Sequence, residues 1–354
     1  MILDRPTDLF LSLTPERVLD AVEAAGLECS PGCHPLNSFE NRVYDVALAD
    51  GTRVVAKFYR PGRWSEAAIL DEHGFMAELV EEGVPICGIR PFPDGATLKR
   101  IDGIAYCLYD RVGGRAPDEL SDDAMEGLGR IAAWIHNVGA RRDAPARPSL
   151  GATTYIRDNV AWLEAQDVLP ASIAGRYATA ALALADMVDR RMAGVPVHRI
   201  HGDLHPGNLL VRDGRFQVLD FDDMAVGPAV QDLWLMVSGR DAHVLRQREA
   251  FLEGYEQLRA FDRTTLRLVE PLRGLRMVHY AAWLARRWHD PIFPQMWPHF
   301  GTEDEWARQT ADLEDVLAFA TAEDDPVVVV PVAETANADL FWDWEEEASL
   351  KSEV

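Results

Sequence analysis

The residues best suited to transfer a phosphoryl group lie in one short stretch of this sequence. Residues 201–208 read His-Gly-Asp-Leu-His-Pro-Gly-Asn, and Asp220 follows twelve residues after Asn208, at the end of an apolar run. Phosphoryl transfer to a hydroxyl group needs a carboxylate that orients the acceptor and takes its proton, and oxygen ligands that hold Mg²⁺ against the phosphates. The spacing assigns Asp203 to the first role. It assigns Asn208 and Asp220 to the second, because Mg²⁺ prefers hard oxygen ligands.

A cation that could contact the phosphates lies earlier in the chain. Lys57 stands within the apolar run Val-Val-Ala-Lys-Phe, where a lysine costs free energy unless it is paired. Glu72 follows fifteen residues later in a predicted helix. A strand lysine paired with a helix glutamate is the arrangement found in protein kinases. Asp71 is a competing partner for Lys57, and spacing alone does not separate the two acids.

The elements that must position these residues fall into two regions. In residues 1–110, alternating patterns and turn residues predict two strand pairs, with one helix between them that starts at Ser65 and ends near Glu82. The strands are expected over 42–48, 53–59, 96–100 and 104–109. Seven later segments carry helix-period apolar residues. They lie near 121–139, 153–165, 171–193, 229–239, 243–259, 264–289 and 303–321. Short strands are expected within 198–223.

These patterns predict an α+β chain with two lobes. We expect residues 1–110 to form a nucleotide-binding N-lobe with a small antiparallel sheet, and residues 111–120 to form a linker. Residues 121–322 are expected to form a larger, mostly helical C-lobe with the catalytic loop and the metal site. Residues 323–354 contain ten acids and one lysine, which is typical of a flexible, solvated terminus.

Composition excludes several classes of protein. The 354 residues are 48% hydrophobic and 26% charged, as in ordinary globular proteins, and the net charge of −23 argues against binding to nucleic acids or anionic membranes. No apolar run is long enough to span a membrane, and the first residues lack a signal-peptide pattern. Four cysteines in a chain of this length are not a disulfide scaffold. We therefore expect a cytoplasmic protein with free thiols.

Four further stretches narrow the comparison. The chain reads Leu-Asn-Ser-Phe-Glu-Asn-Arg-Val-Tyr at 36–44, Lys-Phe-Tyr-Arg-Pro-Gly-Arg-Trp at 57–64, Gly-Pro-Ala-Val-Gln-Asp-Leu-Trp at 227–234 and Ala-Trp-Leu-Ala-Arg-Arg-Trp at 282–288. With the catalytic stretch, these strings resemble the bacterial stress response kinase A family, within the aminoglycoside and choline kinase-like phosphotransferases. The resemblance extends from about Leu13 to about Ala320 and does not cover the acidic tail.

The resemblance implies a bilobal, protein-kinase-like fold and an ATP-dependent Ser/Thr protein kinase. We expect the protein to be a monomer. The resemblance further implies that Asp203 accepts the proton, and that Asp220 is an active-site residue which binds Mg²⁺ together with Asn208. It also places Ser38 in the loop that covers the ATP phosphates, and residues 110–112 at the adenine. The sequence departs from ordinary protein kinases in lacking a Gly-x-Gly-x-x-Gly loop before the first hairpin, and in reading Asp-Phe-Asp instead of Asp-Phe-Gly at 220–222.

Several residues near the motif have simpler interpretations. Asp222 and Asp223 could contact a second metal, but we expect them to be solvated loop carboxylates. We expect Asp232 to steady the catalytic loop, and His201 to bond to backbone near that loop. The motif also fits a small-molecule kinase for an aminoglycoside, choline or homoserine-like hydroxyl. A third hypothesis is a nucleotide-sensing scaffold without activity, which docks partners through the acidic, tryptophan-containing tail.

Overall fold

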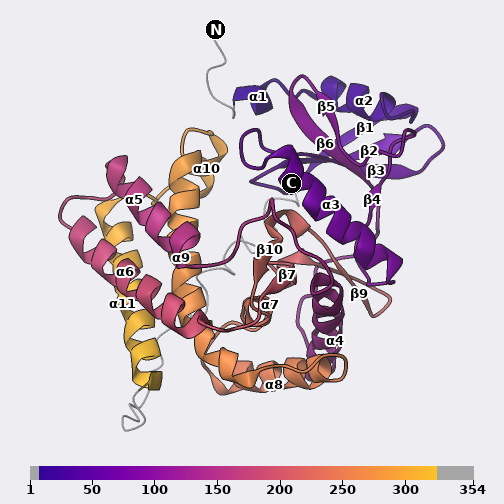
Figure 1. The fold of residues 1–354 in the computed structure, drawn as a ribbon. Helices are drawn as coiled ribbons and strands as arrows, with labels where there is room; N and C mark the ends of the chain where they lie inside the picture. The colour runs from indigo at the N-terminus through magenta and orange to yellow at the C-terminus, as the bar shows by residue number, and fades with distance from the viewer. Residues whose placement is uncertain (1–7, 325–354) are drawn as a thin grey trace.

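A β-rich region and a helical region follow one another in residues 8–324, the part of the chain described by a computed structural model (Figure 1). The N-lobe contains α1 (Asp8–Leu11), α2 (Pro15–Glu23), β1 (Cys29–Leu36), β2 (Arg42–Leu48), β3 (Arg53–Phe58), α3 (Glu66–Glu81), β4 (Ile89–Arg90), β5 (Lys99–Ile101) and β6 (Ile104–Asp110). All its strand pairs are antiparallel, in the order β1-β2-β3-β6-β4, with β5 also on β6. This is the small antiparallel sheet that the sequence predicts.

The sheet fixes the position of Lys57. This residue lies on β3, opposite Val43 of β2 and Cys107 of β6. Its chain neighbours Ala56 and Phe58 belong to the apolar core of the N-lobe, together with Val54 and Leu108. Because successive side chains of a strand point to opposite faces, Lys57 points away from that core and toward α3.

Helix α3 connects the two lobes. It starts at Ser65, whose side chain accepts a hydrogen bond from the backbone N–H of Ala68, and it ends before Gly83, which has a φ of 81°. On one face of α3, Phe75, Met76 and Leu79 belong to the apolar core of the C-lobe rather than to that of the N-lobe. Ile69 of the same helix packs in a small apolar cluster with Tyr59, Ala105 and Cys107 of the N-lobe, so the helix that carries Glu72 contacts both lobes.

The C-lobe begins after the linker. Its helices are α4 (Asp122–Gly139), the π-helical turn η1 (Thr153–Arg157), α5 (Asp158–Ala165), α6 (Ala174–Met192), α7 (Val230–Met236), α8 (Ala242–Glu256), the 3₁₀ segment η4 (Arg263–Leu268), α9 (Val269–Arg287), α10 (Ile292–Met296) and α11 (Glu303–Asp324). Helices α5, α6, α9 and α11 stand together on the left of Figure 1, and we call these four the helical subdomain. Helices α4 and α8 cross on the other side.

Two small sheets hold the predicted catalytic stretch within the C-lobe. Strand β7 (His198–Ile200) pairs with β10 (Ala225–Gly227), and β8 (Leu209–Arg212) pairs with β9 (Arg215–Val218). The short helix η2 (Pro206–Asn208) precedes β8, and η3 (Phe221–Asp223) follows β9. The two-lobed α+β fold predicted from the sequence is thus confirmed.

Some elements were not predicted. Strand β1 contains Pro31, Gly32 and Pro35, residues that disfavour strands, yet it pairs with β2 at the edge of the sheet. Strands β4 and β10 and helix α10 are too short to give a periodic signal. In the described part of the chain no helix is both long enough and apolar enough to cross a membrane. The expectation of a flexible tail concerns residues that lie almost entirely outside 8–324.

Candidate active site

Buried polar side chains fix the backbone of the catalytic loop, residues 201–208. Asp232 of α7 accepts hydrogen bonds from the backbone N–H groups of His201 and Gly202, both at 2.9 Å. The ring of His201 donates from Nε2 to the carbonyl oxygen of Leu219 at 2.7 Å. Both side chains therefore have the structural contacts expected of them, and they fix the loop to the strand that leads to Asp220.

Gly202 explains why this loop reads His-Gly-Asp. Its φ is 86°, and a Cβ atom at this position would lie 2.2 Å from the carbonyl oxygen of Asp223. Any side chain here would both strain the backbone and collide with the segment after Asp220. A glycine at this position thus allows the catalytic loop and the segment after Asp220 to approach each other closely.

Asp203 is the third residue of this loop, and charged groups lie on both sides of its carboxylate. Its Oδ1 atom is 2.6 Å from Nη1 of Arg276, on α9, and its Oδ2 atom is 3.5 Å from Nε2 of His205. The side chain is 19% exposed. Burial by itself would raise the pKa of Asp203, but Arg276 and His205 outweigh burial and hold it well below its usual range. Asp203 is therefore an ionised carboxylate, available to accept a proton.

The two predicted metal ligands offer oxygen atoms close to Asp203. The side-chain amide of Asn208 donates from Nδ2 to the backbone oxygen of Asp203 at 2.9 Å, which leaves its Oδ1 for a cation. The Asp220 side chain is 52% exposed, so its carboxylate is accessible to a cation. The backbone N–H of Leu219 donates a hydrogen bond to the backbone oxygen of Asn208 at 2.9 Å, which joins the segments that carry the two predicted ligands.

One carboxylate and one amide oxygen fit Mg²⁺, which commonly takes its remaining ligands from phosphates and water. Between residues 8 and 324 no group of three or more His, Cys, Asp or Glu side chains could hold a metal without such additional ligands. The donor set therefore suits a metal that arrives with a nucleotide.

Lys57 reaches across from the N-lobe to this site. Its Nζ atom lies 3.1 Å from Asp220 Oδ1 and 3.1 Å from Asp222 Oδ1. The residue is only 5% exposed. Burial lowers the pKa of Lys57, but Asp220, Asp222 and Glu72 outweigh burial and raise it well above its usual value. Lys57 is therefore a fixed positive charge that faces a predicted metal ligand.

Glu72 is the helix acid that lies beside Lys57. Its Oε1 atom is 3.6 Å from Lys57 Nζ, and the residue is fully buried. Asp71 instead accepts a hydrogen bond from the backbone N–H of Ala146 at 2.9 Å, in the C-lobe. Burial raises the pKa of Glu72 to about 7, because it outweighs the opposite effect of Lys57. The choice between the two acids, which spacing left open, is thus made by the orientation of α3.

The expectation that Asp222 is a solvated loop residue was wrong. It is 2% exposed, and besides Lys57 it pairs with Arg63 Nη1 at 2.7 Å. Asp223 differs, since its side chain is 44% exposed, but it also pairs with Arg63. The preceding Phe221 packs edge-on against Phe75 of α3, with 5.9 Å between ring centroids, and this contact directs Asp222 inward.

The loop between β1 and β2 contains Ser38 and Glu40, and ion pairs of Glu40 fix its position. The Glu40 carboxylate pairs with Arg60 at 3.2 Å, with Arg63 at 3.5 Å and with Arg287 of α9 at 2.6 Å. We call Glu40, Arg60, Arg63 and Arg287 the Glu40 cluster. Burial would raise the pKa of Glu40, but the arginines lower it. Sequence reasoning missed this cluster, although Glu40 and Arg287 both lie in stretches that carry the family resemblance.

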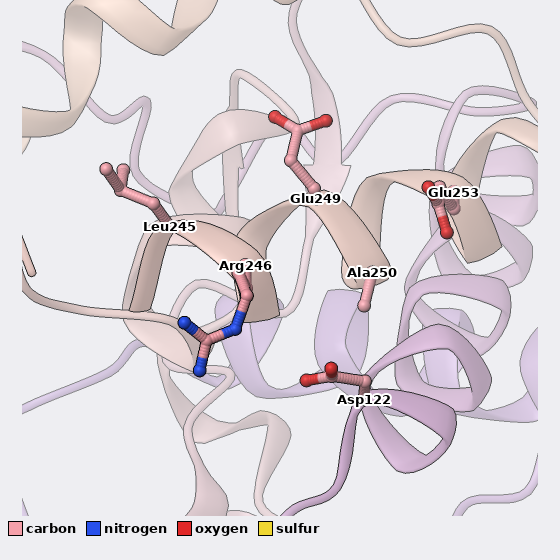
Figure 2. A pocket seen from close by; sticks show the side chains of 6 residues that line it. All are labelled: Asp122, Leu245, Arg246, Glu249, Ala250 and Glu253. Atoms are coloured by element: carbon pink, nitrogen blue, oxygen red, sulfur yellow. The ribbon is translucent and has the colours of Figure 1, made fainter. Parts of the chain in front are cut away.

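Two cavities lie outside this group of side chains. One of about 520 Å³ opens between the linker and the β8–β9 hairpin, and its lining includes Val112, Gly113 and Leu210. The other, of about 440 Å³, lies between the start of α4 and α8 (Figure 2). It is lined by Asp122, Leu245, Arg246, Glu249, Ala250 and Glu253. The first cavity is lined in part by Val112, one of the residues expected at the adenine, whereas no predicted catalytic residue or metal ligand lines either cavity.

Comparison with known proteins shows the family to which this sequence is similar. The model of the phosphotransferase enzyme family matches residues 32–269. Stress response kinase A of Salmonella typhi is 40% identical over 302 residues, which cover 85% of this chain and 92% of that protein. Stress response kinase A of Escherichia coli strain K12 is 39% identical over 310 residues, with the same coverage of both chains. A relative in Salmonella typhimurium, 40% identical over 302 residues, is named serine/threonine protein kinase RdoA.

Solved structures show the same fold at lower identity. An amicoumacin kinase in complex with AMP-PNP, Ca²⁺ and Ami has a TM-score of 0.69 at 18% identity, over 87% of this chain and 95% of that one. A spectinomycin phosphotransferase in complex with ADP and spectinomycin has a TM-score of 0.62 at 13% identity, over 88% and 99% of the two chains. At these identities the likeness concerns the fold alone.

Proposed function

Because the chain belongs to the phosphotransferase enzyme family, and to the stress response kinase A family within it, we propose that it transfers the γ-phosphoryl group of ATP to Ser and Thr hydroxyls of proteins. The observation that carries this proposal is the distance of 3.1 Å between Lys57 of the N-lobe and Asp220 of the C-lobe. A phosphate-binding cation and a metal ligand thus face each other between the lobes, as phosphoryl transfer requires.

In this proposal each side chain has one task. Lys57 contacts the phosphates, and Glu72 orients Lys57. Asn208 and Asp220 would hold Mg²⁺, which neutralises charge on the phosphates when it is bound. Asp203 receives the acceptor hydroxyl, orients it and takes its proton. Ser38 contributes to the loop over the phosphates, and residues 110–112 and the cavity beside them accept the adenine.

Specificity for protein acceptors is supported by the name of the relative in Salmonella typhimurium. The four unpaired cysteines suit a reducing compartment, so we propose a cytoplasmic enzyme, and we propose that it acts as a monomer. The alternative is a small-molecule kinase, since the solved structures with this fold include an amicoumacin kinase and a spectinomycin phosphotransferase. The chemistry at Asp203 would be the same in both cases.

The experiment follows label from γ-labelled ATP with Mg²⁺. Wild type and Asp203→Asn are each incubated with a mixed Ser/Thr protein acceptor, and separately with an aminoglycoside, with choline and with homoserine. Label on Ser and Thr of the protein, from wild type only, is the expected result. Label on a small acceptor without label on protein would replace the proposal by the alternative. If neither acceptor nor ATP is consumed, the chain is not a kinase under these conditions and the proposal fails.

A further inference from the structure

Helix α9 supplies the closest charged contact of the proposed base. Arg276 Nη1 lies 2.6 Å from Asp203 Oδ1. That oxygen is buried and forms no hydrogen bond of good geometry to any described group, so this ion pair is its principal contact. Arg276 comes from the helical subdomain, whereas Asp203 comes from the loop between the two small sheets. The pair therefore joins two parts of the C-lobe at the reacting carboxylate.

The two carboxylate oxygens of Asp203 have different neighbours. Oδ1 is held by Arg276, and Oδ2 lies on the side of His205, at the longer distance of 3.5 Å. A general base acts only when one oxygen is within hydrogen-bond reach of the acceptor proton. The guanidinium group at 2.6 Å from Oδ1 attracts that oxygen, which restricts the rotation of the carboxylate and leaves Oδ2 in a defined place.

Helix α9 does not depend on Arg276 for its packing. Leu272, Leu275, Val278 and Ala282 of the same helix are almost fully buried in the C-lobe core. The Arg276 side chain, in contrast, is 26% exposed and is directed to the catalytic loop. Its contact with Asp203 is thus a local contact at the site rather than a contact that holds the helix.

We propose that Arg276 is the positioning residue of Asp203, which holds Oδ1 so that Oδ2 faces the acceptor hydroxyl. The inference rests on the proposed phosphoryl transfer, but it applies equally to a protein acceptor and to a small one. It also gives the helical subdomain a direct part in the reaction, because a shift of α9 relative to the catalytic loop would reorient the base.

The test compares Arg276→Gln and Arg276→Lys with wild type. Misplacement of a reacting group by about 1 Å costs about 10²-fold in rate, and a loss of this size in kcat is expected for Arg276→Gln. The Kd for Mg-ATP should stay within about twofold, since only the transfer step is affected. Arg276→Lys, and guanidinium added to Arg276→Gln, should each restore part of kcat. Arg176→Gln, which removes an exposed ion pair with Glu314 on α11, is the matched control and should keep wild-type kcat.

A second measurement separates positioning from a general loss of structure. In an Asp203→Asn background, Arg276→Gln should cause no further loss of the residual rate, because a residue that acts through Asp203 has nothing left to position. An additive loss, or a loss of kcat that Lys and guanidinium do not relieve, would overturn the role of Arg276. Unchanged kcat in Arg276→Gln would do the same while leaving the proposed function intact. Absence of any transfer by wild type would overturn the proposed function itself, and the role of Arg276 with it.

Discussion

Glu40 of the N-lobe and Arg287 of the C-lobe form a bidentate ion pair. Arg287 donates from Nη2 to Glu40 Oε1 at 2.7 Å, and its Nε lies 2.6 Å from Glu40 Oε2. Trp283 Nε1, one turn earlier on α9, donates to Glu40 Oε2 as well. The loop that carries Ser38 is thus attached directly to the helical subdomain. This contact joins the loop proposed to cover the phosphates to the helical subdomain, in addition to the covalent linker.

Removal of this charge should therefore affect both stability and nucleotide binding. Glu40→Gln leaves three arginines without their common partner, and loss of one member of a buried pair costs about 3 kcal/mol. We expect a fall of this size in the free energy of unfolding, measured by denaturant titration. We also expect Mg-ATP to bind about tenfold more weakly.

Glu66→Gln is the matched control for Glu40→Gln. Glu66 pairs with Arg100 on the surface of the same lobe, where both side chains are at least half exposed. An exposed pair contributes about 0.2–1 kcal/mol, so the two variants should differ clearly. Equal effects would show that the Glu40 cluster does not couple the lobes.

Asp203→Asn tests the proposed base. It keeps the size of the side chain and its place between Arg276 and His205, but it removes the proton-accepting oxygen. Since general base catalysis contributes about 10²–10⁴-fold, we expect a loss in kcat within this range. The Kd for Mg-ATP, measured by calorimetry, should be unchanged. A variant with wild-type kcat would rule out Asp203 as the base.

The neighbouring acids on α3 provide a paired test of Lys57. Glu72→Gln should lower kcat/KM for ATP by about tenfold or more, because Lys57 loses the side chain that orients it. Asp71→Asn changes only the acceptor of the hydrogen bond from the backbone N–H of Ala146, which the amide oxygen can still accept. It should therefore cost at most about 1 kcal/mol of stability and leave kcat/KM unchanged. The reverse pattern would assign the orienting role to Asp71.

Asp220 can be tested without disturbing its backbone. Its φ is 54°, in the left-handed region that asparagine tolerates better than alanine does. Asp220→Asn should therefore fold normally and weaken the dependence of nucleotide affinity on Mg²⁺, because a neutral amide oxygen binds the cation less strongly than a carboxylate. The dependence is measured as Kd with and without EDTA. Asp167→Asn, at another left-handed aspartate after α5 (φ 51°), is the control. An undiminished Mg²⁺ dependence in Asp220→Asn would exclude the Asp220 carboxylate as a ligand.

His73 predicts a dependence of stability on pH. Its ring is held between Tyr59 OH and Thr97 Oγ1, both at 2.8 Å. Burial, with a smaller effect of Lys57, lowers its pKa from 6.5 to about 3. Below pH 6.5 the unfolded chain binds a proton that the folded chain does not, so stability falls as the pH falls from 6.5 toward 3. The slope for this group is about 1.4 kcal/mol per pH unit.

His73→Gln removes this titration. Its unfolding free energy should therefore fall less steeply than that of wild type between pH 6 and pH 4, whatever its stability at neutral pH. Denaturant titrations at several pH values measure the difference in slope. Identical slopes in the two proteins would mean that His73 is protonated in the folded state.

The sequence by itself determined what depends on residues close together in the chain. The catalytic loop is one such case, because only four residues separate Asp203 from Asn208. The helix that starts at Ser65 and the hairpin that carries Lys57 are others, because capping residues and alternation act over a few positions. The two-lobed α+β fold followed from the order of these local patterns.

Only the tertiary structure decided which distant groups meet. Glu72 rather than Asp71 lies beside Lys57 because the packing of Phe75 and Leu79 sets the rotation of α3. Asp222 is buried because Lys57 and Arg63 of the other lobe neutralise it. Arg276 reaches Asp203, and Arg287 reaches Glu40, from a helix far along the chain. Contacts of this kind produce no characteristic spacing of residues in the sequence. They depend on how helices and strands pack against one another, and not on the residues that connect them.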